Sequence, residues 1–98
     1  SAPMLRALKY VADTCKEFNV PCSVCGEMAG KPLDAMALVA LGITRLSMNA
    51  SSLGAVKAMI LSMNAAEVRE YLLSILSSKS HSLREKLRSF AVDHNIVI

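Results

Sequence analysis

The chain has 98 residues, of which 53% are hydrophobic and 19% are charged, and its formal net charge is +3. A chain this short and this apolar cannot bury all its apolar surface in one small core. We therefore expect a fragment whose exposed apolar surface is covered by further chain or by a second copy, as in a homo-oligomer. Interleaved charges and few aromatic residues argue against nucleic-acid binding. No apolar run approaches the roughly 20 residues that span a membrane.

The three cysteines are an odd number, and no secretion signal precedes them. This usage predicts free thiols in a reducing, cytoplasmic setting.

A helix is predicted to begin at Pro3, where the missing N–H costs nothing, and to end at Asn19. Apolar residues at helical spacing predict one buried face. They are Leu5, Leu8, Val11, Ala12, Cys15 and Phe18. The β-branched, cysteine-bearing run that follows predicts a strand over residues 20–25.

A second helix is predicted from Pro32, and its segment 33–41 is apolar almost all round, which indicates burial on more than one side. Gly42 is a natural stop for it. Residues 43–49 then predict a second strand. Side chains along this strand alternate between two faces, and Leu46 and Met48 lie on the apolar face.

Three further helices are predicted at 53–63, at 64–77, and from about residue 83 to Asp93, each with a capping signal. Ser51 or Ser52 is the expected cap of the first. The expected capping boxes of the other two are Asn64 with Glu67, and Ser82 with Glu85.

Strand, short helix and strand make a βαβ unit, so the two strands are predicted to be parallel with a right-handed crossover. The fold class is therefore α/β, mostly helical, with about two βα units and two extra helices at the end. Two such units are about a quarter of a (β/α)₈ TIM barrel, which needs roughly 250 residues. No repeat or linker marks a second domain, so residues 1–98 are taken as one segment of a larger domain.

The stretch Cys25-Gly26-Glu27-Met28-Ala29-Gly30 is predicted to be a glycine-bracketed loop at the end of the first strand. Loops at the C-terminal ends of parallel strands are where α/β folds place their chemistry. A thiol and a carboxylate two residues apart in such a loop suit a reactive site.

With the Leu46-Ser47-Met48-Asn49 strand at matching separation, this loop resembles that of the phosphoenolpyruvate-utilising enzymes. Within them the sequence is similar to enzyme I of the bacterial phosphotransferase system. Its nitrogen-regulatory type is nearest, judged also by Leu5-Arg6-Ala7-Leu8-Lys9. The resemblance covers the whole chain and implies the C-terminal part of the phosphoenolpyruvate-binding TIM barrel.

The resemblance implies a phosphotransferase that moves the phosphoryl group of phosphoenolpyruvate to a protein histidine and releases pyruvate. Cys25, matched by position, would protonate the enolate carbon. The accepting histidine lies on a separate N-terminal domain, through which a phosphocarrier protein is the implied partner. Mg²⁺ is the implied cofactor, with ligands outside this chain. Sugar transport and nitrogen regulation both remain open as pathways, and the isolated chain is predicted to be inactive.

Two positions depart from the family's pattern. Lys31 stands where an acidic residue usually follows the second glycine, which bears on the charge of the loop. Gly54 stands near a position where proline often opens a helix, which bears only on the stiffness of that helix start.

Each candidate residue has a plainer interpretation. Cys25 could be a buried packing residue, and Cys22 with Cys25 forms a Cys-x-x-Cys that could be a redox or zinc pair. Residues three apart on a strand point to opposite faces, which argues against that pair. Glu27 is expected to bond loop amides rather than act as an acid or base. Ser47 and Asn49 either line the site or serve as caps. Gly26 completes the substrate-binding set.

His81 and His94 stand apart on predicted helix surfaces and are expected to be solvated. The methionines are expected to fill the core. They are Met28, Met36, Met48, Met59 and Met63.

Two other functions remain open from the sequence. A pyruvate phosphate dikinase type of enzyme shares the cysteine loop. A non-enzymatic helical interaction module, assembled through apolar helix faces, is the alternative from another class.

Overall fold

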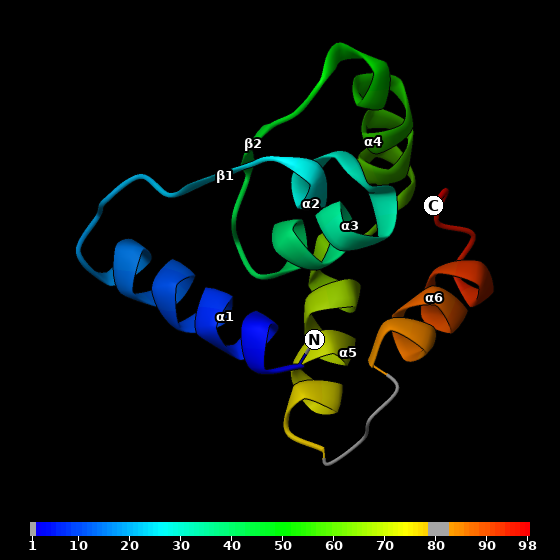
Figure 1. Ribbon diagram of the computed structural model, residues 1–98. Coiled ribbons are helices and arrows are strands. Elements are labelled where there is room, and N and C mark those ends of the chain that lie inside the picture. The colour runs from blue at the N-terminus through cyan, green and yellow to red at the C-terminus, as the bar shows by residue number, and fades with distance from the viewer. Residues whose placement is uncertain (1, 79–82) are drawn as a thin grey trace.

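The computed structural model describes residues 2–78 and 83–98. The chain is mostly helical with two short parallel strands, as predicted (Figure 1). The elements are α1 (Ala2–Glu17), β1 (Ser23–Cys25), α2 (Glu27–Gly30), α3 (Pro32–Ala40), β2 (Arg45–Ser47), α4 (Ala50–Ser62), α5 (Ala65–Leu76) and α6 (Leu83–Asp93).

The two strands pair in parallel, with Ser23 opposite Arg45 and Cys25 opposite Ser47. Both are shorter than predicted, three residues each instead of residues 20–25 and 43–49. Each strand has only one partner in the described chain, so ladder hydrogen bonds end where that pairing ends. The predicted loop after β1 also differs, because residues 27–30 form the short helix α2.

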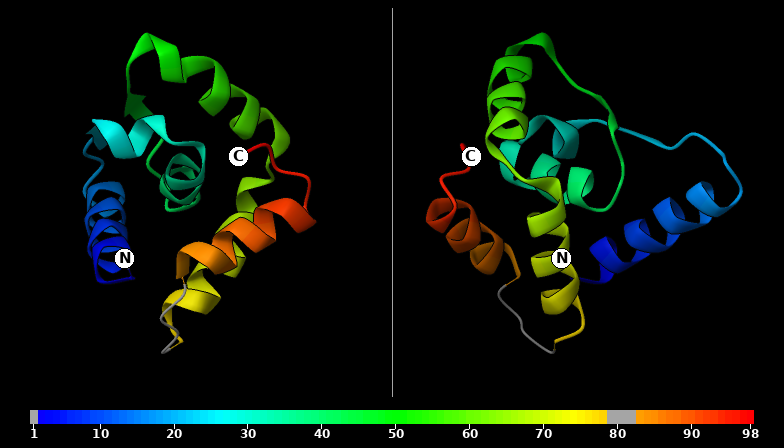
Figure 2. Two further views of the ribbon diagram at one scale, coloured as in Figure 1. Left: turned by 45° about the vertical axis from the view of Figure 1, so that its right-hand side comes forward. Right: turned by 180° about the vertical axis from the view of Figure 1, so that it is seen from behind.

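Helix α3 is the centre of the fold, and α2, α4 and α5 all pack against it (Figures 1 and 2). Its side chains are buried on nearly every side, as the apolar run predicted. Met36 of α3 is fully buried in one core with Met59 of α4 and Leu72 of α5. Leu38 of α3 is fully buried in a second cluster, with Ala12 and Ile43. Met28, Met48 and Met63 pack against the core while partly exposed, so the predicted role of the methionines is confirmed.

Left-handed backbone at C-terminal ends stops three of the helices. Gly42 has a φ of 96°, and the N–H groups of Gly42 and Ile43 donate to Val39 and Leu38 at 2.9 and 3.0 Å, which is a Schellman motif. Asn19 and Asn95, with φ of 55° and 56°, end α1 and α6 in the same way. The stops predicted at Asn19 and Gly42 are therefore confirmed.

The predicted N-terminal caps had mixed outcomes. The Asn64 side chain accepts a hydrogen bond from the Glu67 N–H at 3.1 Å and caps α5, as predicted. The cap predicted at Ser51 or Ser52 is wrong, because α4 begins at Ala50 and Asn49 takes the cap position. Ser82, predicted to cap α6, lies outside the described residues, as does His81.

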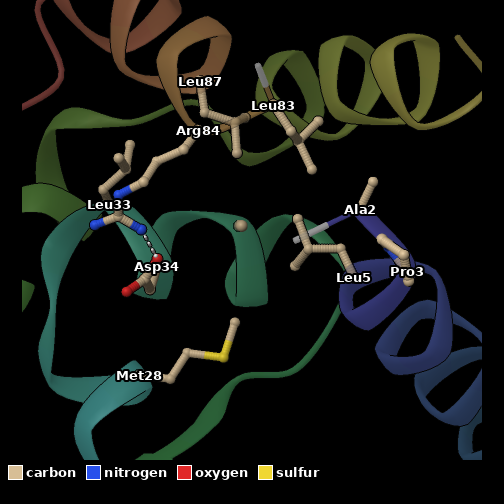
Figure 3. A pocket seen from close by; sticks show the side chains of 10 residues that line it. Ala2, Pro3, Leu5, Met28, Leu33, Asp34, Leu83, Arg84 and Leu87 are labelled. Carbon is tan, nitrogen blue, oxygen red and sulfur yellow. Dashed lines mark hydrogen bonds and ion pairs between the residues drawn. The ribbon is translucent and has the colours of Figure 1, made fainter. Parts of the chain in front are cut away.

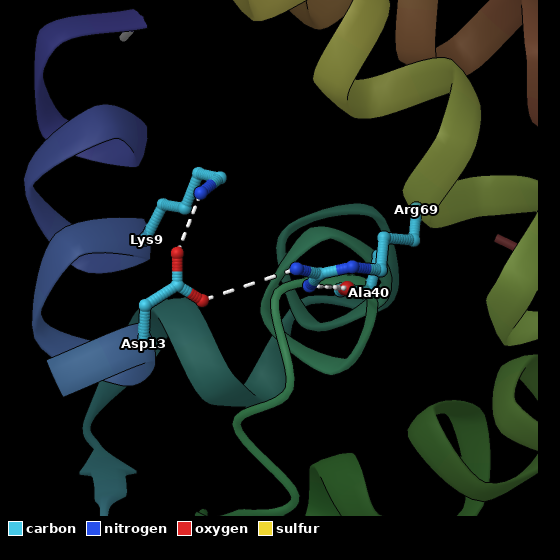
Figure 4. A network of polar contacts seen from close by, with 4 residues as sticks. All are labelled: Lys9, Asp13, Ala40 and Arg69. Carbon is cyan, nitrogen blue, oxygen red and sulfur yellow. Dashed lines mark hydrogen bonds and ion pairs between the residues drawn. The ribbon is translucent and has the colours of Figure 1, made fainter. Parts of the chain in front are cut away.

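Polar contacts hold α1 against the rest of the molecule. Arg6 donates two hydrogen bonds, of 3.1 and 2.7 Å, to the Leu76 carbonyl at the end of α5. Arg69 of α5 donates to the Ala40 carbonyl at 3.1 Å and lies 3.9 Å from Asp13 of α1 (Figure 4). The hydrogen bond from Lys9 is the main cause that lowers the pKa of the Asp13 carboxyl.

The apolar face predicted for α1 is only half correct. Leu5 and Ala12 are buried, but Val11 is 47% exposed and Phe18 is 69% exposed. Other large apolar side chains are exposed elsewhere, and they include Tyr10, Val20, Leu53, Leu61, Val92 and Val97. This uncovered surface agrees with the expectation from composition that the chain needs a covering partner. The partner itself, further chain or a second copy, stays a prediction.

A cavity of about 330 Å³ lies between the start of α1, α3 and α6 (Figure 3). Its wall is mainly apolar, and Arg84 of α6 closes one side through a 2.6 Å hydrogen bond to Asp34 of α3. None of the predicted site residues lines it.

His94 is exposed, as predicted, but it is not isolated. Its ring stacks on Phe90 with centroids 3.8 Å apart, and Phe90 stacks on Tyr71 at 4.5 Å. A single sequence gives no sign of this stack, because Tyr71 comes from a different helix. Within residues 2–78 and 83–98, no helix has both the length and the apolar character needed to cross a membrane.

Candidate active site

Cys25 is the last residue of β1, and its side chain is exposed. The buried neighbours of the strand lie on its other face, where Val24 packs against Ile43 and Leu38. Since partners in a parallel ladder point to the same face, Cys25 and Ser47 present their side chains together. Gly26 then turns the chain into α2 with a φ of 105°, a conformation that side chains rarely adopt.

A cleft of about 510 Å³ opens at this end of the strands. It brings together all five predicted site residues, which are Cys25, Gly26, Glu27, Ser47 and Asn49. Gly30, Lys31, Met48 and Ser52 complete its wall. The predicted residues thus come from two segments about twenty positions apart in sequence, and the parallel pairing joins them.

The start of α4 forms one wall of the cleft. Asn49 occupies the cap position, yet its side chain makes no capping hydrogen bond, and its carbonyl accepts from the Ser52 N–H at 2.9 Å. Gly30 lets α2 approach this wall closely. A Cβ built on Gly30 would lie 3.0 Å from the Ser52 hydroxyl oxygen and 3.6 Å from the Met48 Cβ.

The cleft carries one carboxylate and one ammonium, from Glu27 and Lys31, and both side chains are exposed. Within the described residues the Glu27 carboxylate makes no hydrogen bond to the loop amides, so the expected bonding role is not seen. Lys31 places a positive charge in the cleft wall beside the Glu27 carboxylate.

Ser52 also lines the cleft, although the sequence predicted only a capping role for Ser51 or Ser52. The sequence signal that could have indicated this is Asn49, a residue type that often caps a helix. Once the helix starts at Ala50, Ser52 falls in its first turn, and that turn faces α2.

The Cys-x-x-Cys interpretation does not fit the structure. Cys22 is half-buried and packs against a cluster that contains Leu38 and Ile43. Cys25 lines the cleft, whereas Cys22 lines a different cavity.

The cleft residues do not make a magnesium site by themselves. Among the described residues, no three His, Cys, Asp or Glu side chains come together as a group that could hold a metal ion. Of the cleft-wall residues that the structure describes, Glu27 is the one carboxylate. Mg²⁺ needs near-octahedral oxygen ligands, so one exposed carboxylate is not sufficient.

Comparison with known families decides the broader identity. The sequence model of one protein family, described as "PEP-utilising enzyme, PEP-binding domain", matches residues 1–65. These residues include both strands and the whole cleft wall. The chain belongs to this family of phosphoenolpyruvate-utilising enzymes. The predicted resemblance to the family is therefore confirmed over residues 1–65, whereas its predicted extent over the whole chain is not.

Several relatives in the phosphoenolpyruvate-utilising family are similar to this chain. The phosphoenolpyruvate-dependent phosphotransferase system protein of Salmonella typhimurium is 43% identical over 54 residues, 55% of this chain and 7% of that protein. The phosphoenolpyruvate-protein phosphotransferase of Streptomyces coelicolor is 44% identical over 55 residues, 56% of this chain and 10% of that protein. The phosphoenolpyruvate synthase of Pyrococcus furiosus is 33% identical over 54 residues, 55% of this chain and 7% of that protein.

The matched stretch therefore spans no more than 10% of the length of these relatives. No solved structure matches the chain with significance.

The glycines allow a matched test of the approach of α2 to α4. Gly30→Ala should destabilise the chain, because the new Cβ would lie within 3.2 Å of two Ser52 atoms. Gly54→Ala, in the open interior of α4, should stabilise it by about 0.5–1 kcal/mol. Urea unfolding of both variants provides the measurement. Equal stabilisation by the two substitutions would contradict the close approach.

Proposed function

We propose that this chain is the C-terminal part of the phosphoenolpyruvate-binding barrel of a phosphoenolpyruvate-protein phosphotransferase, with Cys25 as the proton donor. The observation that carries the proposal is the cleft, in which an exposed thiol at a strand end lies with Ser47, Asn49, Glu27 and Lys31. The family match and the phosphotransferase relatives support the same assignment.

The proposed reaction requires a group that donates a proton to the methylene carbon of the enolate. When the phosphoryl group leaves phosphoenolpyruvate, the remaining enolate becomes pyruvate once its methylene carbon gains a proton. A thiol has a reference pKa of about 8.5, so it holds a proton at neutral pH and yet can release it. The exposure of Cys25 lets solvent return the proton after each turnover.

The other cleft residues are assigned to binding. The Ser47 hydroxyl and the Asn49 amide can donate hydrogen bonds to the oxygens of the substrate. Lys31 contributes a positive charge toward an anionic ligand. Gly26 keeps backbone, rather than a side chain, beside the thiol, and Glu27 is assigned to the edge of the substrate site.

The remaining parts of the proposal lie outside this chain. The accepting histidine, the phosphocarrier partner, the Mg²⁺ ligands and the cytoplasmic location belong to the complete protein that the proposal describes. Sugar transport and nitrogen regulation both remain compatible with it.

A second candidate is supported by the phosphoenolpyruvate synthase relatives, which match over a similar length. In an enzyme that runs from pyruvate toward phosphoenolpyruvate, such as a synthase or a pyruvate phosphate dikinase, the Cys25 thiolate would remove the methyl proton instead. Family membership favours either enzyme over the non-enzymatic helical module.

By itself, the chain of 98 residues should not release pyruvate from phosphoenolpyruvate. Phosphoryl transfer depends on positioning and on neutralising the charge of the phosphate. Among the described residues, the cleft wall offers a single cation, Lys31, for that purpose. A coupled lactate dehydrogenase assay measures pyruvate, with the Cys25→Ala chain as the control. Pyruvate formation above that control would contradict the prediction.

The proposal is tested by substrate protection in a complete protein that carries this segment. Phosphoenolpyruvate should slow the alkylation of Cys25 by iodoacetamide and leave the alkylation of Cys15, which lines another cavity, unchanged. Mass spectrometry of the labelled peptides measures both rates in one sample. Equal rates at Cys25 with and without phosphoenolpyruvate would count against the proposed site.

A further inference from the structure

A second thiol site lies away from the Cys25 cleft, near the turn that joins α1 to β1. Cys15 is in the last turns of α1, and Cys22 lies just before β1. The turn folds back on the helix, because the Val20 N–H donates to the Cys15 carbonyl at 2.7 Å and Asn19 adopts a φ of 55°. The chain therefore reverses direction between the two cysteines.

Both cysteines line one cavity of about 250 Å³, and both are half-buried. Cys15 is also a neighbour of Cys22 in this cavity, because after burial the Cys15 thiol is the cause that raises the pKa of Cys22. The cavity is several times the roughly 30 Å³ that one water molecule occupies, so a small oxidant can enter it. Lys16, Arg45 and Arg69 also line it.

We propose that Cys15 and Cys22 are a reversible dithiol site that a peroxide converts to an intramolecular disulfide, leaving Cys25 reduced. The sequence pattern Cys22-x-x-Cys25 suggested a different pair. The fold separates that pair between two cavities and brings Cys22 to Cys15 instead. This inference does not depend on the proposed phosphotransferase function.

The reaction balances with hydrogen peroxide as the oxidant. The Cys15 sulfur attacks one peroxide oxygen, the O–O bond breaks, and the sulfur becomes a sulfenic acid while hydroxide leaves. The Cys22 sulfur then attacks the Cys15 sulfur, the S–O bond breaks, and its proton leaves in water. Two thiols lose two electrons and two protons, and one peroxide becomes two water molecules.

The order of attack follows from the surroundings of Cys22. Burial, and after it the neighbouring Cys15 thiol, raises the pKa of Cys22. A thiol that keeps its proton attacks peroxide slowly, so Cys22 is assigned the resolving step.

The bond would tie the start of β1 to α1. Cys25 is three residues beyond Cys22 and faces the other cavity, so the crosslink would leave its thiol free. Oxidant would thus be consumed at a site that does not include the proposed proton donor.

The experiment treats the purified chain with a small excess of hydrogen peroxide, followed by alkylation and mass spectrometry. Trypsin cleaves after Lys16 and so separates Cys15 from Cys22 and Cys25. We expect the loss of two of the three thiols, a Cys15–Cys22 crosslink located by fragmentation, an alkylated Cys25, and full recovery with dithiothreitol. The Cys25→Ser chain should form the same crosslink, and the Cys15→Ser chain should form none within the molecule.

The same peroxide treatment of the wild-type chain in concentrated urea provides a control that does not require any variant to fold. There the preference for Cys15–Cys22 should disappear, because it arises from the folded turn. A crosslink that includes Cys25 in the native wild-type chain would overturn the proposal. So would crosslinks between chains, or over-oxidised cysteines without a disulfide.

Discussion

Replacing Cys25 by Ser in a complete enzyme that carries this segment is expected to slow pyruvate formation by roughly 10²–10⁴-fold, the usual contribution of a positioned general acid. Phosphoryl exchange between phosphoenolpyruvate and the acceptor histidine should continue in part, because the thiol acts only after the phosphoryl group has left. A serine hydroxyl is too weak an acid near pH 7 to replace the thiol. Pyruvate formation and isotope exchange are measured on the same preparation.

Thermal unfolding of that variant separates chemistry from packing. Cys25 is exposed, so Cys25→Ser should leave the melting temperature nearly unchanged, and Cys15→Ser serves as a matched control away from the cleft. If Cys25 were only a packing residue, the serine variant would lose stability while it kept its rate. A folded Cys25→Ser enzyme with the parent rate of pyruvate formation would end the catalytic assignment.

Leu72→Ala should cost about 2–5 kcal/mol of the free energy of unfolding, because the side chain is 0% exposed where α5 packs on α3. Native proteins are stable by only about 5–15 kcal/mol, so this loss is a large fraction of the total stability. Leu61→Ala makes the same change in α4, where the side chain is 77% exposed. It should alter stability by no more than about 0.5 kcal/mol.

Urea unfolding followed by circular dichroism measures both leucine variants. The comparison removes intrinsic helix propensity, since each replaces Leu by Ala inside a helix. A similar loss at the two positions would mean that α5 does not pack on α3 as described, and the support beneath the cleft would be in doubt.

Local signals in the sequence were sufficient for most of the helices and their ends. Pro32 and Gly42 bracket α3, and Asn64 caps α5, because these residues act on backbone groups within a few positions. The βαβ order was sufficient to predict a parallel pair, and the parallel pair is what brings Ser47 to Cys25.

The missed features depend on contacts between distant segments. Val11 and Phe18 have helical spacing, but periodicity does not say how much partner surface is available to cover them. Ser52 joins the cleft because α2 packs on α4, and Cys22 shares a cavity with Cys15 because the chain reverses at the left-handed Asn19. No pattern within one segment contains that information.

The central claim is that Cys25 delivers the proton to the enolate carbon, and the stereochemistry of that delivery tests it most directly. A complete enzyme carrying this segment is given phosphoenolpyruvate with deuterium and tritium at defined methylene positions, and the configuration of the pyruvate methyl group is determined. A proton held on one face of the enolate gives one configuration. We expect a single configuration from the parent enzyme and a racemic methyl group from Cys25→Ala, because solvent protonates the released enolate on either face. A single configuration from the Cys25→Ala enzyme would contradict the claim.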